Sequence, residues 1–366
     1  MHAAVYDAVN AIDKSHTPYL VSNLAPVWSM ASPEATAASA AFRVLIELYP
    51  GQRRTLVLRW VEQLRQIPEA LPKSLGVRLG FIVAERILAQ RSNDGSNAQL
   101  PAFVAGNAPG NYQLTPPNFP QPAFRQWPQV TPFTLTKADQ FRLGPPPALT
   151  SDTYTAAFQE VKELGFMNST TRSADQTQIG QFWNGSIWDY WNEIAQTAAV
   201  SHNLTVAESA RLFALLNLTL ADSAIAFYDT KYTYLFWRPV TAIRAADTDG
   251  NPQTVADPNW LPLSVRTAAD PSYPGAHSAI SAASAAVLRF FFNTDDFSYD
   301  VTSEVLPGVE RSFASFTAAA DEAGLSRIYA GVHFRTDHTA GQQLGLNVAA
   351  YVFQNFLVPV GQSENK

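Results

Sequence analysis

The chain contains no cysteine among its 366 residues. This absence excludes a disulfide scaffold, a thiolate zinc site, an iron–sulfur cluster and a cysteine nucleophile. Charged residues are also scarce, at 15%, and the net charge is −6. A nucleic-acid-binding protein normally carries a basic stripe, so we expect no nucleic-acid partner.

Long apolar runs are missing as well. No uninterrupted apolar stretch reaches the roughly 18 residues that cross a bilayer, and the most hydrophobic tract, 348–360, is broken by Gln354, Asn355 and Pro359. We therefore expect no membrane span. The chain opens inside an amphipathic helical pattern rather than a secretory signal. We expect a soluble protein, and export to the periplasm or medium stays open as an alternative, with the leader absent from this sequence.

Apolar residues are nonetheless plentiful, at 46%, which suffices for a large core and excludes wholesale disorder. Their spacing is helical almost throughout, and few segments alternate with period two, so we expect an all-α helical bundle. Ser32 and Ser151 read as N-caps of two of the helices. The helical patterns cover residues 5–12, 33–48, 56–64, 75–88, 152–161, 176–182, 187–199, 206–228, 277–292, 309–323 and 337–356.

One stretch departs from this pattern. Residues 101–150 hold 11 of the 25 prolines, interleaved with aromatic residues. Prolines forbid long helices, so we expect a long loop packed by its aromatics, either a functional loop or a wrapping belt. The expected division is 1–150, with N-terminal helices and this loop, and 151–366, a C-terminal helical bundle, together forming one compact unit. The belt could cover the body or a partner subunit, which leaves a homo-oligomer open.

Three short segments in the last 140 residues concentrate the chemistry. They are 231–239, 274–277 and 326–337. Lys231 and Arg238 are seven residues apart, which on one helix places both cations on one face about 10 Å apart, and Pro239 places Arg238 near a helix end. Their neighbours are aromatic, and cations in apolar surroundings need an anionic partner.

The other two segments supply histidines and a third long cation. Gly275 and Ala276 leave the backbone uncrowded at a helix start, where free amides favour an anion and His277 would border it. Arg327 and His333 lie on either side of Gly331, which offers a helix break. Asp337, four residues beyond His333, can accept the Nδ1 proton and leave Nε2 unprotonated and facing the anion.

Other site types fit less well. His333, Asp337 and His338 could ligate a metal cation, but the lysine and the two arginines would repel it. No Gly-x-Ser-x-Gly elbow supports a serine hydrolase. Neither Gly-x-Gly-x-x-Gly nor a Walker-type loop is present. The residues therefore favour a pocket for a multiply charged oxyanion.

Lys-x6-Arg-Pro, then Pro-x-x-His, then Ser-Arg-x5-His-x3-Asp is similar to the signature of vanadium-dependent haloperoxidases and type 2 phosphatidic-acid phosphatases. The segments 2–12, 145–151 and 182–183 also resemble the bacterial haloperoxidase branch, an α-helical bundle fold. The resemblance implies vanadate as cofactor, with phosphate able to occupy the same site, and hydrogen peroxide, a halide and a small organic acceptor as reaction partners.

Residue roles follow from the resemblance by position. It implies that His333 binds vanadium directly and that Lys231, Arg238 and Arg327 hold the oxyanion's oxygens beside Gly275 and Ala276. His277 would be the acid–base residue, and we count Asp337 with His277 and His333 as catalytic. In the phosphatase relatives the residue at His333 is instead the nucleophile that becomes phosphorylated.

The second element departs from the family pattern, which has Ser-Gly where this chain has Gly275-Ala276. A lost hydroxyl bond is worth about 0.5–1.5 kcal/mol, or more to a charged partner, so oxyanion binding is expected to weaken roughly 3- to 30-fold. Three functions stay open: a haloperoxidase-like enzyme first, a phosphomonoesterase using His333 second, and a non-catalytic oxyanion-binding relative third.

Overall fold

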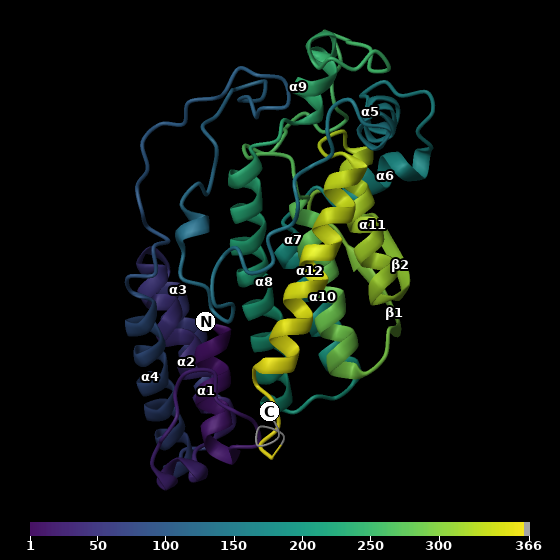
Figure 1. Cartoon of the computed structure of the whole chain (residues 1–366). Helices are drawn as coiled ribbons and strands as arrows, with labels where there is room; N and C mark the ends of the chain where they lie inside the picture. Colours follow the sequence, from purple (N-terminus) through teal and green to yellow (C-terminus); the bar gives the residue numbers. More distant parts are fainter. Residues whose placement is uncertain (362–366) are drawn as a thin grey trace. The chain divides into compact units, whose positions relative to one another are not determined.

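The computed structural model describes residues 1–361, and helices dominate it, as the sequence predicts (Figure 1). The α-helices are α1 (His2–Asp13), α2 (Pro33–Leu48), α3 (Arg53–Arg65), α4 (Leu71–Arg91), α5 (Asp152–Leu164), α6 (Ala174–Phe182), α7 (Ile187–Ser201), α8 (Val206–Tyr234), α9 (Pro239–Arg244), α10 (Ala276–Phe292), α11 (Phe316–Tyr329) and α12 (Arg335–Asn355). Short 3-10 turns are η1 (Pro26–Met30), η2 (Pro50–Gln52), η3 (Trp127–Gln129) and η4 (Ala246–Thr248).

Local signals explain several helix starts. The Ser32 hydroxyl accepts a hydrogen bond from the Ala35 amide at 3.2 Å, and the Ser151 hydroxyl accepts one from the Tyr154 amide at 3.2 Å. Each bond satisfies one of the free amides of a helix's first turn. Both predicted N-caps are therefore confirmed.

The expected helix over 309–323 is partly wrong. Residues Glu310–Ser315 form strand β2, which pairs antiparallel with β1 (Asp296–Thr302), and helix α11 begins only at Phe316. Ser315 ends the strand, and its hydroxyl caps α11 by accepting from the Ala318 amide at 3.1 Å. The burial of β1 and β2 alternates weakly, which is why period-two alternation was not apparent in the sequence.

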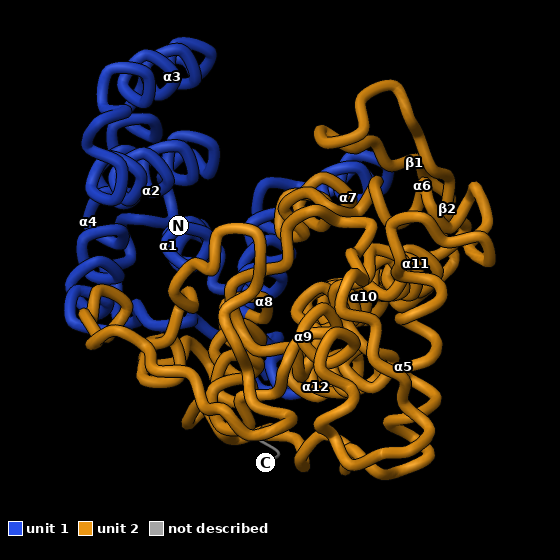
Figure 2. The backbone as a smooth tube through the Cα atoms, turned by 90° about the horizontal axis from the view of Figure 1, so that it is seen from above, with its two compact units in different colours: residues 1–94, 195–218, 351–366 blue, residues 95–194, 219–350 orange. Residues whose placement is uncertain are grey.

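The chain divides into two compact units, coloured separately in Figure 2. Unit 1 contains Met1–Asp94, Ala195–Leu218 and the described residues from Tyr351, and unit 2 contains Gly95–Ile194 and Thr219–Ala350. This division differs from the expected boundary at residue 150. The proline-rich loop belongs to unit 2, together with every candidate site residue.

Unit 1 is built on close contact between α2 and α4. A Cβ added at Gly76 would lie 2.8 Å from the Ser32 carbonyl oxygen, and one at Gly80 would lie 2.6 Å from that of Thr36. Only glycine permits this approach of the two backbones. The apolar cluster around it includes Leu79, Val83 and residues of α1.

Several hydrogen bonds fix the proline-rich loop to the rest of unit 2, and two sets of them matter for the site. The buried Asp222 carboxylate accepts hydrogen bonds from the amides of Phe133, Thr134 and Leu135 at 2.7, 2.6 and 2.9 Å. In the second set the Tyr112 amide donates to the Leu235 carbonyl at 2.6 Å. The loop therefore pairs with the segment that leads directly into Arg238.

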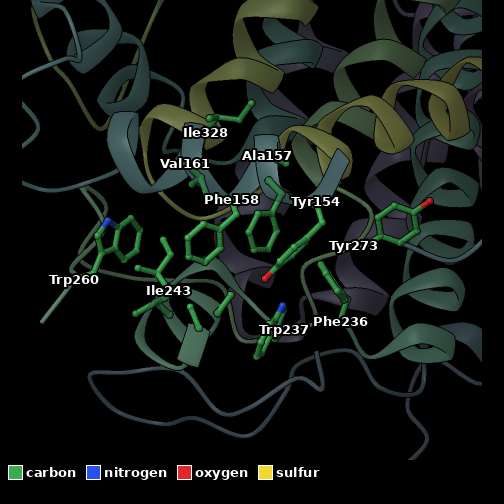
Figure 3. Packing of buried hydrophobic residues seen from close by; sticks show 14 residues of the cluster. Tyr154, Ala157, Phe158, Val161, Phe236, Trp237, Ile243, Trp260, Tyr273 and Ile328 are labelled. Carbon is green, nitrogen blue, oxygen red and sulfur yellow. The ribbon is translucent and has the colours of Figure 1, made fainter. Parts of the chain in front are cut away.

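An aromatic cluster fills the interior of unit 2 (Figure 3). Tyr154 and Phe158 of α5 point toward Phe236 and Trp237, which immediately precede Arg238. Phe334 packs in the same cluster, 5.8 Å from the ring of Phe236. Trp237 directly precedes Arg238, and Phe334 directly follows His333. Burial of this cluster therefore fixes the backbone next to both site residues.

Helices α10 and α12 approach closely through small residues. A Cβ at Gly345 would lie 2.1 Å from the Ala279 carbonyl oxygen, and one at Gly341 would lie 2.4 Å from that of Gly275. At the end of the same contact the Gly275 amide donates to the Asp337 carbonyl at 2.8 Å. This packing brings the segment 275–277 beside the segment 333–337.

Helix α8 bears on the expectation that the chain has no membrane span. By length and mean hydropathy it is apolar enough to span a bilayer, although its apolar residues do not form one uninterrupted run. However, 78% of its apolar window is buried within the structure, as in the core helix of a bundle. The helix therefore supplies only weak support for a membrane span.

Candidate oxyanion site

Lys231 and Arg238 do not share a helix face, so this expectation is wrong. Helix α8 ends at Tyr234, and Leu235 takes a left-handed backbone conformation with φ 47°. Arg238 is the N-cap of α9, extended before Pro239, as the Arg-Pro pair predicted. The two cations converge nonetheless, because both contact the Asp270 carboxylate.

Lys231 is completely buried near the end of α8. Its ammonium group donates to Asp270 Oδ1 at 3.3 Å, to the Ser272 carbonyl at 3.1 Å and to the Pro271 carbonyl. These three acceptors match the three hydrogens of an ammonium group. Burial lowers the pKa of Lys231 to about 8, and Asp270 opposes that shift by stabilising the charged form.

Arg238 is also buried and contacts three segments. Its Nε donates to the Asp270 carbonyl at 2.8 Å, and its Nη2 donates to the Asp270 carboxylate. Its Nη1 donates to the Val332 carbonyl at 2.8 Å and lies 3.0 Å from His333 Nε2. Arg238 therefore connects the segment before α10 to the segment before α12.

Arg327 lies in the last turn of α11, and Gly331 (φ 79°) follows in the turn before α12. The Nη1 of Arg327 donates to Asn184 Oδ1 at 3.1 Å. Its Nε is buried and has no hydrogen-bond partner among residues 1–361. Burial, with a smaller contribution from Arg238, lowers the pKa of Arg327 to about 10.

His333 and Asp337 form the pair that the sequence predicted. His333 Nδ1 lies 2.9 Å from Asp337 Oδ2, which also accepts from the Ser272 hydroxyl at 2.5 Å and from the Phe334 amide at 3.0 Å. Burial raises the pKa of Asp337 to about 6, against the hydrogen bonds that lower it. The carboxylate is thus ionised at neutral pH.

The partners of His333 define its tautomer. An arginine can only donate, so Nε2 must accept from Arg238 and Nδ1 must carry the proton that Asp337 accepts. Burial and then the charges of Arg238, Lys231 and Arg327 lower the pKa of His333 well below its usual value. His333 is therefore neutral, with an unprotonated Nε2 among cations.

His277 lies at the start of α10, which begins at Ala276 with Gly275 as its N-cap, as predicted. Its Nε2 lies 3.1 Å from the Trp183 carbonyl, an acceptor, so Nε2 carries the proton and Nδ1 is the unprotonated nitrogen. Burial and the charge of Arg327 lower the pKa of His277 well below its usual value. His277 is therefore positioned as a base.

The charged side chains of the site act electrostatically on one residue, His333. The charges of Arg238, Lys231 and Arg327, together with His277, all act on His333. Gly275 is tied to the cluster through the Asp337 carbonyl, and Ala276 follows it in the first turn of α10. His338, by contrast, directs Nδ1 to the Ser278 hydroxyl at 2.9 Å. Within residues 1–361 no group of three histidine, aspartate or glutamate side chains is arranged to hold a metal cation.

Sequence reasoning missed four residues of this site. Asp270 binds both Lys231 and Arg238, Ser272 binds Asp337, Asn184 binds Arg327, and the Trp183 carbonyl faces His277. The first two stand only seven and five residues before His277. An acid directly before a Pro-Ser-Tyr-Pro segment was the available signal for Asp270. Trp183 lies in the segment 182–183 that carries the resemblance, but no signal gave it a role in the site, and none identified Asn184.

The residues present fit a tetrahedral oxyanion such as vanadate. The site contains three buried cations and two buried carboxylates, Asp270 and Asp337, which leaves an excess of one positive charge. The Nε of Arg327 still lacks an acceptor, and a buried charged donor without one is costly. A small anion would supply that acceptor, and His333 Nε2 offers a lone pair once Arg238 turns to the anion.

Comparisons with known proteins show which sequences and folds this chain is similar to. A family model described as the VCPO second helical-bundle domain matches residues 211–360. The vanadium chloroperoxidase of Curvularia inaequalis is 26% identical over 323 residues, covering 65% of this chain and 52% of that protein. The chain thus spans about half the length of this curated relative.

Solved structures extend the likeness to most of the chain. The first bacterial vanadium-dependent iodoperoxidase superposes with a TM-score of 0.83 and 26% identity, covering 98% of this chain and 89% of that one. A holo-type bacterial vanadium-dependent chloroperoxidase gives a TM-score of 0.74 at 17% identity, covering 96% and 89%, which supports the fold alone. In its fold over most of the chain, and in its sequence over residues 211–360, the chain is therefore similar to vanadium-dependent haloperoxidases.

Proposed function

We propose that this protein is a vanadate-dependent haloperoxidase-like enzyme that oxidises a halide with hydrogen peroxide. The net reaction consumes one halide ion, one hydrogen peroxide and one proton, and yields hypohalous acid and water. The hypohalous acid then halogenates a small organic acceptor. The observation that carries this proposal is the unpartnered, buried Nε of Arg327 beside a neutral His333 whose Nε2 is unprotonated.

His333 would bind the vanadium through Nε2, with Asp337 fixing its ring through Nδ1. Arg327 would hold the oxyanion by hydrogen bonds. Arg238 would use its one unpaired hydrogen and the Nη1 hydrogen that His333 Nε2 releases on binding vanadium, and Lys231 would act by its charge. Bound vanadate would supply Lewis-acid activation of hydrogen peroxide. His277 would take up a proton at Nδ1, because its Nε2 hydrogen is held by the Trp183 carbonyl.

A second function is favoured by the same histidine. An imidazole with an unprotonated Nε2 and a carboxylate at Nδ1 is also a suitable nucleophile for a phosphate ester. In that reaction His333 would form the phosphoryl–nitrogen bond. A non-catalytic oxyanion-binding role would follow if Gly275-Ala276 and the fully engaged Lys231 weaken the site too far.

One set of assays separates these functions. We expect the protein loaded with orthovanadate to brominate a phenolic dye in the presence of peroxide and bromide. Hydrolysis of a chromogenic phosphate ester without halogenation would instead support the phosphatase, and calorimetric vanadate binding with neither activity would support the binding protein. We also expect His333→Ala to abolish vanadate binding with an unchanged circular-dichroism spectrum; unchanged affinity would refute its ligand role.

A further inference from the structure

The Asp270 carboxylate contacts two of the three cations of the candidate oxyanion site. The side chain is buried between the two cations of the first segment, and Oδ1 accepts from Lys231 at 3.3 Å and from Arg238. The carboxylate therefore holds a position on two cations at which a guest anion would otherwise be bound. Arg327 is the one cation of the three without a carboxylate contact within residues 1–361.

The backbone around Asp270 is held too firmly for the carboxylate to withdraw with it. Arg238 Nε donates to the Asp270 carbonyl at 2.8 Å, and Lys231 donates to the carbonyls of Pro271 and Ser272. The Ser272 amide in turn donates to the Phe236 carbonyl at 2.8 Å. These hydrogen bonds fix the backbone of Asp270 beside the two cations.

Lys231 and Arg238 have few hydrogen-bond donors left for a bound anion. All three hydrogens of the Lys231 ammonium have acceptors in the protein, and four of the five N–H hydrogens of Arg238 have acceptors. The excess charge is +1 with Asp270 ionised and would be +2 without it. A doubly charged guest would therefore leave the buried site with a net negative charge.

We infer that Asp270 selects the charge of the bound oxyanion, restricting the site to singly charged tetrahedral oxyanions held mainly by Arg327. This inference rests on the oxyanion site of the proposed function, but not on its catalytic step. Among tetrahedral oxyanions, the site would therefore prefer those with a single negative charge. Vanadate holds its second proton more tightly than phosphate, so at neutral pH such a site favours vanadate.

The test uses two tetrahedral anions whose charge does not change with pH, perrhenate (−1) and sulfate (−2), titrated calorimetrically into the full chain. We expect the unmodified protein to bind perrhenate at least as tightly as sulfate. In Asp270→Asn we expect sulfate to bind at least tenfold more tightly. Because Coulomb energy scales with guest charge, the logarithm of the sulfate gain should be about twice that of the perrhenate gain.

Asp296→Asn makes the same chemical change at an exposed position of unit 2 and should alter neither affinity. Unchanged or weaker sulfate binding in Asp270→Asn, or equal gains for both anions, would overturn the inference. If that variant does not fold, sulfate binding tenfold tighter than perrhenate in the unmodified protein would overturn it equally.

The outcome also separates this inference from the proposed function. Charge selection without vanadate-dependent halogenation would refute the haloperoxidase while supporting the role of Asp270. Arg327→Ala should abolish binding of both anions. Absence of any anion binding in the unmodified protein and in Asp270→Asn would refute both proposals together.

Discussion

Asp337 Oδ2 lies 2.9 Å from His333 Nδ1, and this one oxygen accepts three hydrogen bonds while Oδ1 has no partner among the described residues. The carboxylate thus fixes both the tautomer and the orientation of the imidazole. Such partners of a metal-binding histidine raise its basicity as well as aligning it. The contact between these two residues therefore determines what His333 can bind.

Replacing this carboxylate is expected to weaken the cofactor site. Asp337→Ala removes the acceptor at Nδ1, and we expect vanadate affinity to fall about 10- to 100-fold, the range found when such partners are lost. Ser272→Ala removes only one bond to the same oxygen and should cost less than tenfold. Calorimetric titration measures both. Equal losses in the two variants would contradict the orienting role of Asp337.

His277→Ala is expected to affect turnover more than binding. Its Nε2 hydrogen is engaged by the Trp183 carbonyl, so only Nδ1 can exchange a proton with a guest. Proton transfer by a positioned side chain contributes about 10²- to 10⁴-fold to a rate. Steady-state halogenation and vanadate titration measure the two effects. His202→Ala, at an exposed histidine, is the control, and a larger loss of affinity than of rate in His277→Ala would assign His277 to binding.

The sequence predicted the helical bundle and six side chains of the candidate site for identifiable reasons. Helical spacing and serine caps are local properties, and Gly331 and the His333–Asp337 spacing lie within one short segment. Asp270, Asn184 and Trp183 act on residues between 32 and 143 positions away, so their roles depend on packing that no local pattern records. The same applies to Lys231 and Arg238, whose convergence depends on the left-handed Leu235 rather than on a helical face.

Stability should fall in mild acid because of His338. Burial lowers the pKa of His338 to about 4, whereas the unfolded chain titrates near 6.5. Between these values the unfolded state binds the extra proton, so stability rises with pH and is lost as pH falls from about 6.5 to about 4. The contribution is up to about 3 kcal/mol. Urea unfolding at pH 7 and pH 5 should show a smaller acid loss in His338→Gln than in the unmodified protein; equal losses would refute this assignment.

Gly345→Ala should destabilise the site-bearing unit although alanine is the better helix former. The added Cβ would lie 2.1 Å from the Ala279 carbonyl oxygen, so α10 and α12 would have to separate. We expect a loss of about 1–3 kcal/mol in the free energy of unfolding, measured by urea titration. Gly51→Ala, where no atom lies within 4 Å of the new Cβ, should change it by less than about 0.5 kcal/mol. Equal effects at both positions would show that the helix contact yields without cost.

Asp222→Ala should release the proline-rich loop. The carboxylate satisfies the amides of Phe133, Thr134 and Leu135, and each buried amide left without an acceptor costs about 1–3 kcal/mol. We expect a loss of at least about 3 kcal/mol in the free energy of unfolding and faster proteolysis within residues 101–150. Asp139→Ala removes a loop carboxylate whose Lys137 contact is partly exposed, and it should change neither quantity measurably. Because the loop also pairs with Leu235, a cleaved but still folded Asp222→Ala protein should lose oxyanion affinity, whereas retained affinity would make the loop a covering belt without influence on Arg238.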